Sequence, residues 1–139
     1  MAKETKERIK GMKDAKDIKR VLVVGSGVMG NSIAQVFATA DISVALVDVD
    51  EKVLSHAINL MKSGLTTLAD CGKIPSGRIP SILSRIKLST NLTEMAGDTD
   101  FIIEAVNEVP DVKKKVFSQL GKLCSADTVI ASNTRIEVL

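Results

Sequence analysis

The sequence VLVVGSGVMGNSIAQVFATA, residues Val21–Ala40, contains the most informative pattern of the chain. It opens with Val21–Val24, four apolar and mostly β-branched residues that are typical of a buried strand. Gly25, Gly27 and Gly30 follow at G-x-G-x-x-G spacing, and the residues after them have helical character. A strand, a glycine turn and a helix N-terminus in this order form a pyrophosphate site, because the helix end presents unpaired N–H groups and about half a positive charge.

The three glycines have different expected roles. Gly25 permits the sharp turn out of the strand, and Gly27 lets phosphate oxygens approach the backbone. Gly30 lets the helix pack closely against the strand. The spacing alone is weak evidence for a dinucleotide site, so the rest of the chain has to supply the structural context.

Charge is distributed unevenly along the 139 residues. Residues 1–20 carry eight Lys or Arg and four Asp or Glu, whereas the remainder carries eleven and thirteen. We therefore expect residues 1–19 to form a solvated basic leader and residues 20–139 to form one domain.

Several classes of protein are disfavoured by the composition. Three Phe and no Tyr or Trp argue against stacking of nucleic-acid bases, so no nucleic-acid partner is expected. Cys71 and Cys124 lie far apart without metal-ligand spacing, which predicts no metal site and favours reduced thiols in a cytoplasmic protein. Acidic residues in the leader and the polar stretch around Gly25 argue against a signal peptide or a membrane span.

An acidic residue ends the second apolar run, Ile42–Asp48. Asp48 lies 23 positions after Gly25. In a βαβ unit, an acid at this distance accepts hydrogen bonds from the adenosine ribose and repels a 2′-phosphate, which predicts NAD rather than NADP as cofactor. The alternative is that Asp48 is a helix cap or turn residue, a role that Asp50 could also fill.

The rest of the chain alternates between strand and helix patterns. Strands are expected over 20–25, 42–48, 86–90, 101–106 and 128–132, and helices over 28–40, 51–71, 80–85 and 111–124, with a polar connector before the fourth strand. This alternation predicts an α/β fold with a Rossmann-type parallel sheet in the order 3-2-1-4-5, helices on both faces, incomplete at its C-terminal end. The expected core face of the first helix consists of Ile33, Val36, Phe37 and Ala40.

From Asp17 to Thr134 the chain resembles the N-terminal NAD-binding domain of 3-hydroxyacyl-CoA dehydrogenases, including 3-hydroxybutyryl-CoA dehydrogenases. Besides the glycine motif, the resemblance rests on VALVD, GKIP, ILSRIKLSTNL, DFIIEAVNE and ASNT. It implies an oxidoreductase that transfers a hydride between NAD and a 3-hydroxyacyl-CoA in fatty-acid metabolism. Asp48, EAVNE and ASNT count against other dehydrogenases with the same opening, such as the 3-hydroxyisobutyrate type. The cofactor-binding residues implied by the family pattern are Gly25, Gly27, Val28, Met29, Gly30, Asp48, Ala105, Glu108, Lys113 and Asn133.

Two of these residues have alternative explanations. Lys113 could be a solvated helix lysine, and Glu108 could be an acid that stabilises a helix N-terminus.

The departures from the family pattern concern catalysis. Arg135 stands where the family has a serine that contacts the reacting hydroxyl, and the family's catalytic histidine and glutamate would lie beyond residue 139. His56 is the only histidine; it precedes the expected catalytic position in the sequence, and we expect it to be exposed. For the phosphates of acyl-CoA, Lys73 is the only contact that we expect. We therefore expect no catalytic residue here and an NAD-binding portion that is inactive alone. The alternative is a non-catalytic module or a subunit completed by another chain.

The sheet edge formed by residues 128–132 also predicts a homo-oligomer.

Overall fold

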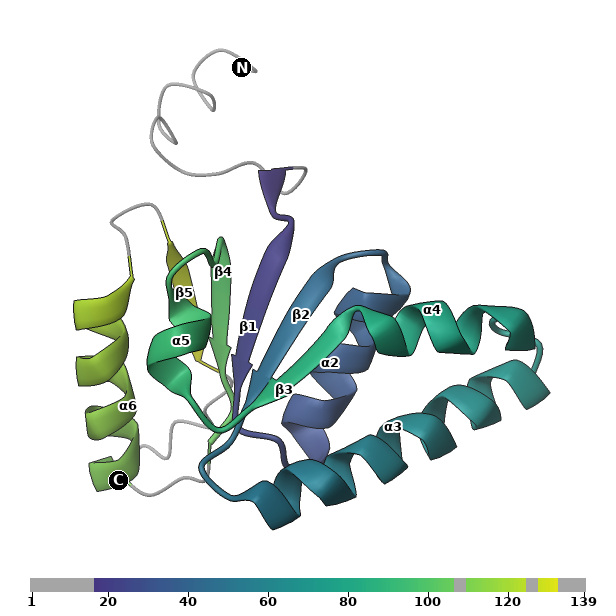
Figure 1. The fold of residues 1–139 in the computed structure, drawn as a ribbon, viewed down its shortest axis with the longest axis horizontal. Helices are drawn as coiled ribbons and strands as arrows, with labels where there is room; N and C mark the ends of the chain where they lie inside the picture. The colour runs from purple at the N-terminus through teal and green to yellow at the C-terminus, as the bar shows by residue number, and fades with distance from the viewer. Residues whose placement is uncertain (1–16, 107–109, 125–127, 133–139) are drawn as a thin grey trace, which may run out of the picture.

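A five-stranded parallel sheet forms the centre of the computed structural model, which describes residues 17–106, 110–124 and 128–132 (Figure 1). The sheet order is β3-β2-β1-β4-β5. This order confirms the predicted Rossmann-type arrangement. The strands are β1 (Arg20–Val24), β2 (Ser43–Val47), β3 (Ile86–Ser89), β4 (Phe101–Glu104) and β5 (Val129–Ser132).

Helices cover both faces of the sheet (Figure 1). One face carries α2 (Val28–Thr39), α3 (Glu51–Asp70) and α4 (Ile79–Ser84), and the 3₁₀ turn Ser76–Arg78 precedes α4. The other face carries α5 (Leu92–Ala96) and α6 (Pro110–Leu123).

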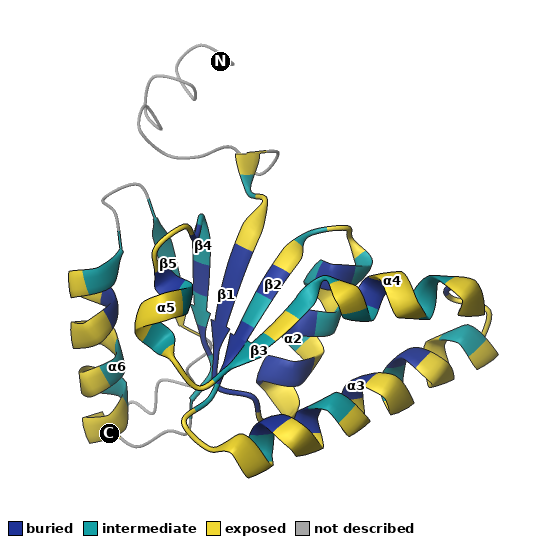
Figure 2. Ribbon diagram, viewed as in Figure 1, coloured by how far each residue is buried: buried dark blue, intermediate teal, exposed yellow. Residues whose placement is uncertain are grey.

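Alternate residues of β1 enter two separate cores. Val21 and Val23 pack with α2, α3 and α4, whereas Leu22 and Val24 pack with α5 and α6. Figure 2 shows the buried positions concentrated on the central strands and on the helix sides that face them. This two-sided burial explains why β1 is a continuous apolar run.

The expected core face of α2 is wrong at two positions. Ala40 is exposed and lies just beyond the helix, as its C-cap. Val36 is 68% exposed, and the fully buried positions are the small or polar residues Gly30, Asn31, Ala34 and Ala38. Ile33 and Phe37 only border the core. A Cβ on Gly30 would overlap the carbonyl oxygen of Gly25, so the helix approaches the turn too closely for large side chains.

A short helix lies within the segment that was expected to be a polar connector. Asn91 is its N-cap, and the side-chain oxygen accepts from the backbone N–H of Glu94 at 3.1 Å. Ala96 of this helix is buried. The spacing of Asn91 and Glu94 is that of a capping box, a signal that the sequence does contain.

Candidate functional site

The glycine turn lies at the carboxyl edge of the sheet, between the ends of β2 and β4. The backbone N–H of Gly25 donates to the carbonyl oxygen of Val47 at 2.7 Å. Gly25 has φ +105°, and a Cβ there would lie 2.6 Å from the carbonyl oxygen of Ala105. Both the backbone conformation and the lack of space therefore require glycine at this position.

The N-terminus of α2 is open to an incoming anion. Its N-cap is Gly27, which makes no side-chain capping bond, and no acidic side chain lies in the first turn. A Cβ on Gly27 would meet nothing within 4 Å. Val28 and Met29 of the same turn are exposed. The unpaired N–H groups and the positive end of the helix dipole can therefore face a ligand here.

Asp48 is held against the glycine turn by Ser26, which was not among the predicted site residues. The backbone N–H and the Oγ of Ser26 both donate to Oδ2 of Asp48 at 3.0 Å, across 22 residues of sequence. The backbone N–H of Asp50 donates to Oδ1 at 3.1 Å. Asp48 is only half-buried, so its carboxylate also has access to the space beside the turn.

The helix-capping role belongs to Asp50. Its Oδ1 accepts from the backbone N–H of Lys52 at 2.9 Å, and Asp50 is the N-cap of α3. Asp48 is thus not the cap. Its Oδ1 does accept from the backbone N–H two residues on, as in an Asx turn, so the alternative of a turn residue stays open. The ribose contact stays a prediction.

A cavity of about 360 Å³ adjoins these groups. Of the predicted site residues, it brings together Gly25, Gly27, Asp48 and Ala105. Val112 of α6 is 44% exposed and also lines this cavity. The volume falls within the range of roughly 300–1,000 Å³ that is usual for small-molecule sites. The remaining lining is mostly apolar and comes from Val24, Val47, Val49, Thr90, Leu92, Val106, Val116 and Gln119.

A buried carboxylate lies at the end of β4. Glu104 is fully buried, and its Oε2 accepts from the backbone N–H of Val106 at 3.2 Å. Its Oε1 accepts from Ser132 Oγ at 3.4 Å and lies 3.7 Å from Lys113 Nζ. The Lys113 side chain is only 13% exposed, so the alternative of a solvated lysine is wrong. Its contact with NAD stays a prediction, since Lys113 does not line the cavity. Glu104 was not among the predicted site residues, although an acid ending the apolar run FIIE was a usable signal.

Among the described residues, His56 and Lys73 do not line this cavity. Glu108, Asn133 and Arg135 lie outside the described residues, as does most of the leader. His56 is exposed on α3, as expected. Lys73 is also exposed, and its contact with acyl-CoA stays a prediction.

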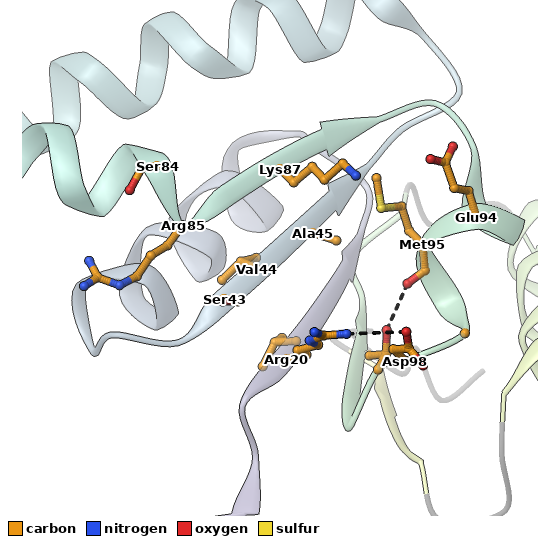
Figure 3. Close-up of a pocket in the computed structure, with 13 residues that line it drawn as sticks. Arg20, Ser43, Val44, Ala45, Ser84, Arg85, Lys87, Glu94, Met95 and Asp98 are labelled. Atoms are coloured by element: carbon orange, nitrogen blue, oxygen red, sulfur yellow. Dashed lines mark hydrogen bonds and ion pairs between the residues drawn. The ribbon is translucent and has the colours of Figure 1, made fainter.

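A larger cavity of about 520 Å³ lies at the opposite edge of the sheet, where β1 and β2 begin. Figure 3 shows Arg20, Lys87, Glu94 and Asp98 around it. Arg20 pairs with Asp98 at 3.5 Å, and both side chains are largely solvated. Because ligands of open parallel sheets bind at the carboxyl ends of the strands, the smaller cavity is the candidate site.

Within the described ranges, no helix is long and apolar enough to cross a membrane, and no three His, Cys, Asp or Glu side chains gather as metal ligands. Cys71 and Cys124 are free thiols. Partial burial raises the pKa of the Cys124 thiol above its ordinary value.

Known proteins match this chain over most of its length. Residues 20–136 match the family described as 3-hydroxyacyl-CoA dehydrogenase, NAD binding domain. A probable 3-hydroxyacyl-CoA dehydrogenase of Caenorhabditis elegans is 36% identical over 122 residues, which are 85% of this chain and 41% of that protein. A probable 3-hydroxybutyryl-CoA dehydrogenase of Bacillus subtilis is 35% identical over 118 residues, again 85% and 41% of the two chains.

The fold is also similar to a solved structure. The (S)-3-hydroxybutyryl-CoA dehydrogenase from Ralstonia eutropha superposes with a TM-score of 0.80 at 35% identity, over 85% of this chain and 41% of that one. The chain thus spans well under half the length of these relatives. By its match over residues 20–136, the chain belongs to the 3-hydroxyacyl-CoA dehydrogenase family, in the region described as the NAD-binding domain.

Proposed function

We propose that this chain binds NAD at the carboxyl edge of its sheet, with Asp48 on the adenosine ribose. The observation that carries the proposal is the position of the Asp48 carboxylate, which Ser26 holds at 3.0 Å beside the glycine turn. A carboxylate accepts hydrogen bonds from the two ribose hydroxyls and repels the 2′-phosphate of NADP.

The other groups of the site suit the remaining parts of the dinucleotide. The open N-terminus of α2 faces its pyrophosphate, because Gly27 places no side chain in the way. The apolar walls contributed by Val47, Val49 and Leu92 suit a planar base. When bound, NAD supplies hydride transfer.

Hydride transfer with a 3-hydroxyacyl-CoA is the reaction that we propose for the whole protein. The similar proteins of Caenorhabditis elegans and Bacillus subtilis are a probable 3-hydroxyacyl-CoA dehydrogenase and a probable 3-hydroxybutyryl-CoA dehydrogenase. We propose further that a polypeptide of these 139 residues binds cofactor without turnover. Its only histidine, His56, is exposed on α3 and does not line the cavity, and a missing general base typically costs about 10²- to 10⁴-fold in rate.

Isothermal titration calorimetry with NAD and NADP tests the cofactor proposal. NAD should bind at least roughly tenfold more tightly than NADP, the factor expected for a single ribose contact of this kind. Equal affinities would remove the role of Asp48. An assay with acetoacetyl-CoA and NADH tests the proposal that there is no turnover. Reduction of acetoacetyl-CoA by the 139 residues alone would contradict it.

A second candidate is an NAD-binding module or subunit whose reaction another chain completes. Arg135, in the place of the family's serine, favours this candidate.

We also propose that the protein is cytoplasmic and that copies associate through β5, which is an edge strand of the described sheet. Light scattering of the purified protein tests the association, and a monomer at high concentration would contradict it.

A further inference from the structure

The side chain of Glu104 is charged and fully buried, which requires compensation. Its hydrogen bonds and ion pair come from three parts of the carboxyl edge. Val106 follows its own strand, Ser132 ends β5, and Lys113 belongs to α6. One carboxylate therefore links the ends of two strands to the first turns of a helix.

Lys113 occupies a position that α6 alone does not favour. It is the fourth residue of that helix, where the dipole disfavours a cation. The neighbouring Lys114 and Lys115 are exposed, whereas Lys113 is turned inward against Glu104. The ion pair with Glu104 thus stabilises the inward position of this lysine.

The cluster lies on the opposite side of β1 from Asp48. In the sheet order, β2 lies on one side of β1 and is followed in the chain by Asp48. The strands β4 and β5 lie on the other side of β1. A dinucleotide bound across the reversal of strand order places one mononucleotide half over each side. With adenosine at Asp48, the nicotinamide half extends over the ends of β4 and β5.

We infer that Glu104 is a positioning residue for the nicotinamide half of the cofactor, an inference that rests on the proposed NAD site. Glu104 does not line the cavity, so it acts through the groups that it holds. It fixes the ammonium of Lys113 and the end of β5, immediately before Asn133.

The test compares NAD with ADP, which has only the adenosine half and its phosphates. In Glu104→Gln, the side chain keeps its shape but loses the charge that holds Lys113. The dissociation constant for NAD should rise about tenfold, as expected when one charge-assisted hydrogen bond is lost, and that for ADP should stay unchanged. Glu94→Gln, at an exposed position of α5, is the matched control and should change neither constant.

Bound NADH gives a second readout, because its dihydronicotinamide ring is itself fluorescent. In Glu104→Gln, the fluorescence emission spectrum of bound NADH should become more similar to that of free NADH than it is in the unmodified chain. If this variant does not fold by circular dichroism, Lys113→Met replaces it, with the exposed Lys114→Met as control.

Three outcomes overturn the inference. Equal losses for NAD and ADP would show a merely structural role. NAD binding that is unchanged in both Glu104→Gln and Lys113→Met would refute the inference and leave the proposed function intact. No NAD binding by the unmodified chain would contradict the proposed function and the inference together.

Discussion

Replacing Asp48 by Asn should change cofactor preference more than it changes folding. The carboxylate oxygens accept from Ser26 at 3.0 Å and from Asp50 at 3.1 Å. The amide oxygen of Asn can keep the bonds from Ser26, but its NH₂ group would face the N–H of Asp50. The bond from Asp50 is exposed, so water can replace it, and the cost to folding is about 1 kcal/mol.

The cost to NAD binding is larger. A ribose hydroxyl that donates to a carboxylate contributes about 1.5–3 kcal/mol, so Asp48→Asn should weaken NAD roughly 10- to 100-fold. NADP should bind no more weakly than before, because the repulsion of its 2′-phosphate is relieved. Calorimetric titration of both cofactors into both proteins measures the change in preference.

Asp50→Ala is the matched control, two residues away. It removes the N-cap of α3 and should lower the free energy of unfolding by about 1 kcal/mol without weakening NAD. The reasoning on Asp48 is refuted if Asp48→Asn weakens NAD and NADP equally. It is also refuted if Asp50→Ala causes the same change in preference.

The remaining predictions concern the glycine turn and the cysteines. Gly30→Ala should destabilise the fold by about 1–3 kcal/mol in urea denaturation, because its methyl group would overlap the carbonyl oxygen of Gly25; unchanged stability would contradict this packing. Gly27→Ala should fold normally, since no atom lies within 4 Å of the new Cβ, but bind NAD about tenfold more weakly, and full affinity would place the pyrophosphate elsewhere. Near neutral pH, Cys124 should be alkylated more slowly than exposed Cys71, because burial raises the pKa of the Cys124 thiol and lowers its thiolate fraction. Raising the pH should narrow this difference in peptide mass spectrometry, and faster alkylation of Cys124 at neutral pH would contradict the prediction.

Strand order and the position of Asp48 could be predicted because they follow from local patterns. The apolar run of β1, the glycine spacing and the acid at the end of the second run all lie within one βαβ unit. Such a unit has one favoured handedness, which leaves few topologies to consider.

The helix faces were harder to predict. Hydrophobic periodicity gives weight to large side chains, so it selected Val36. Close contact at Gly30 instead turns the small residues Ala34 and Ala38 toward the sheet. The five residues of α5 are too few for periodicity, and only the capping pattern at Asn91 marks that helix.

Ser26 and Glu104 were missed because their partners are distant in sequence. Ser26 meets Asp48 across 22 residues, and Glu104 meets Ser132 across 28. These contacts depend on which strands become neighbours. A sequence pattern identifies the residue type but not the partner that determines its role.

The two acids beside the turn show how environment separates their roles. Val24, the last residue of β1, pairs in register with Val47 on one side and with Glu104 on the other. Asp48, next after Val47, is half-buried and keeps a carboxylate that can accept hydrogen bonds from a ligand. Glu104 is fully buried one strand from the turn, at a spacing of roughly 5 Å between strands, where an unpaired negative charge would repel a pyrophosphate. Lys113 neutralises that charge, which is what the proposed NAD site requires of an edge that holds an acid and must also accept negative phosphates.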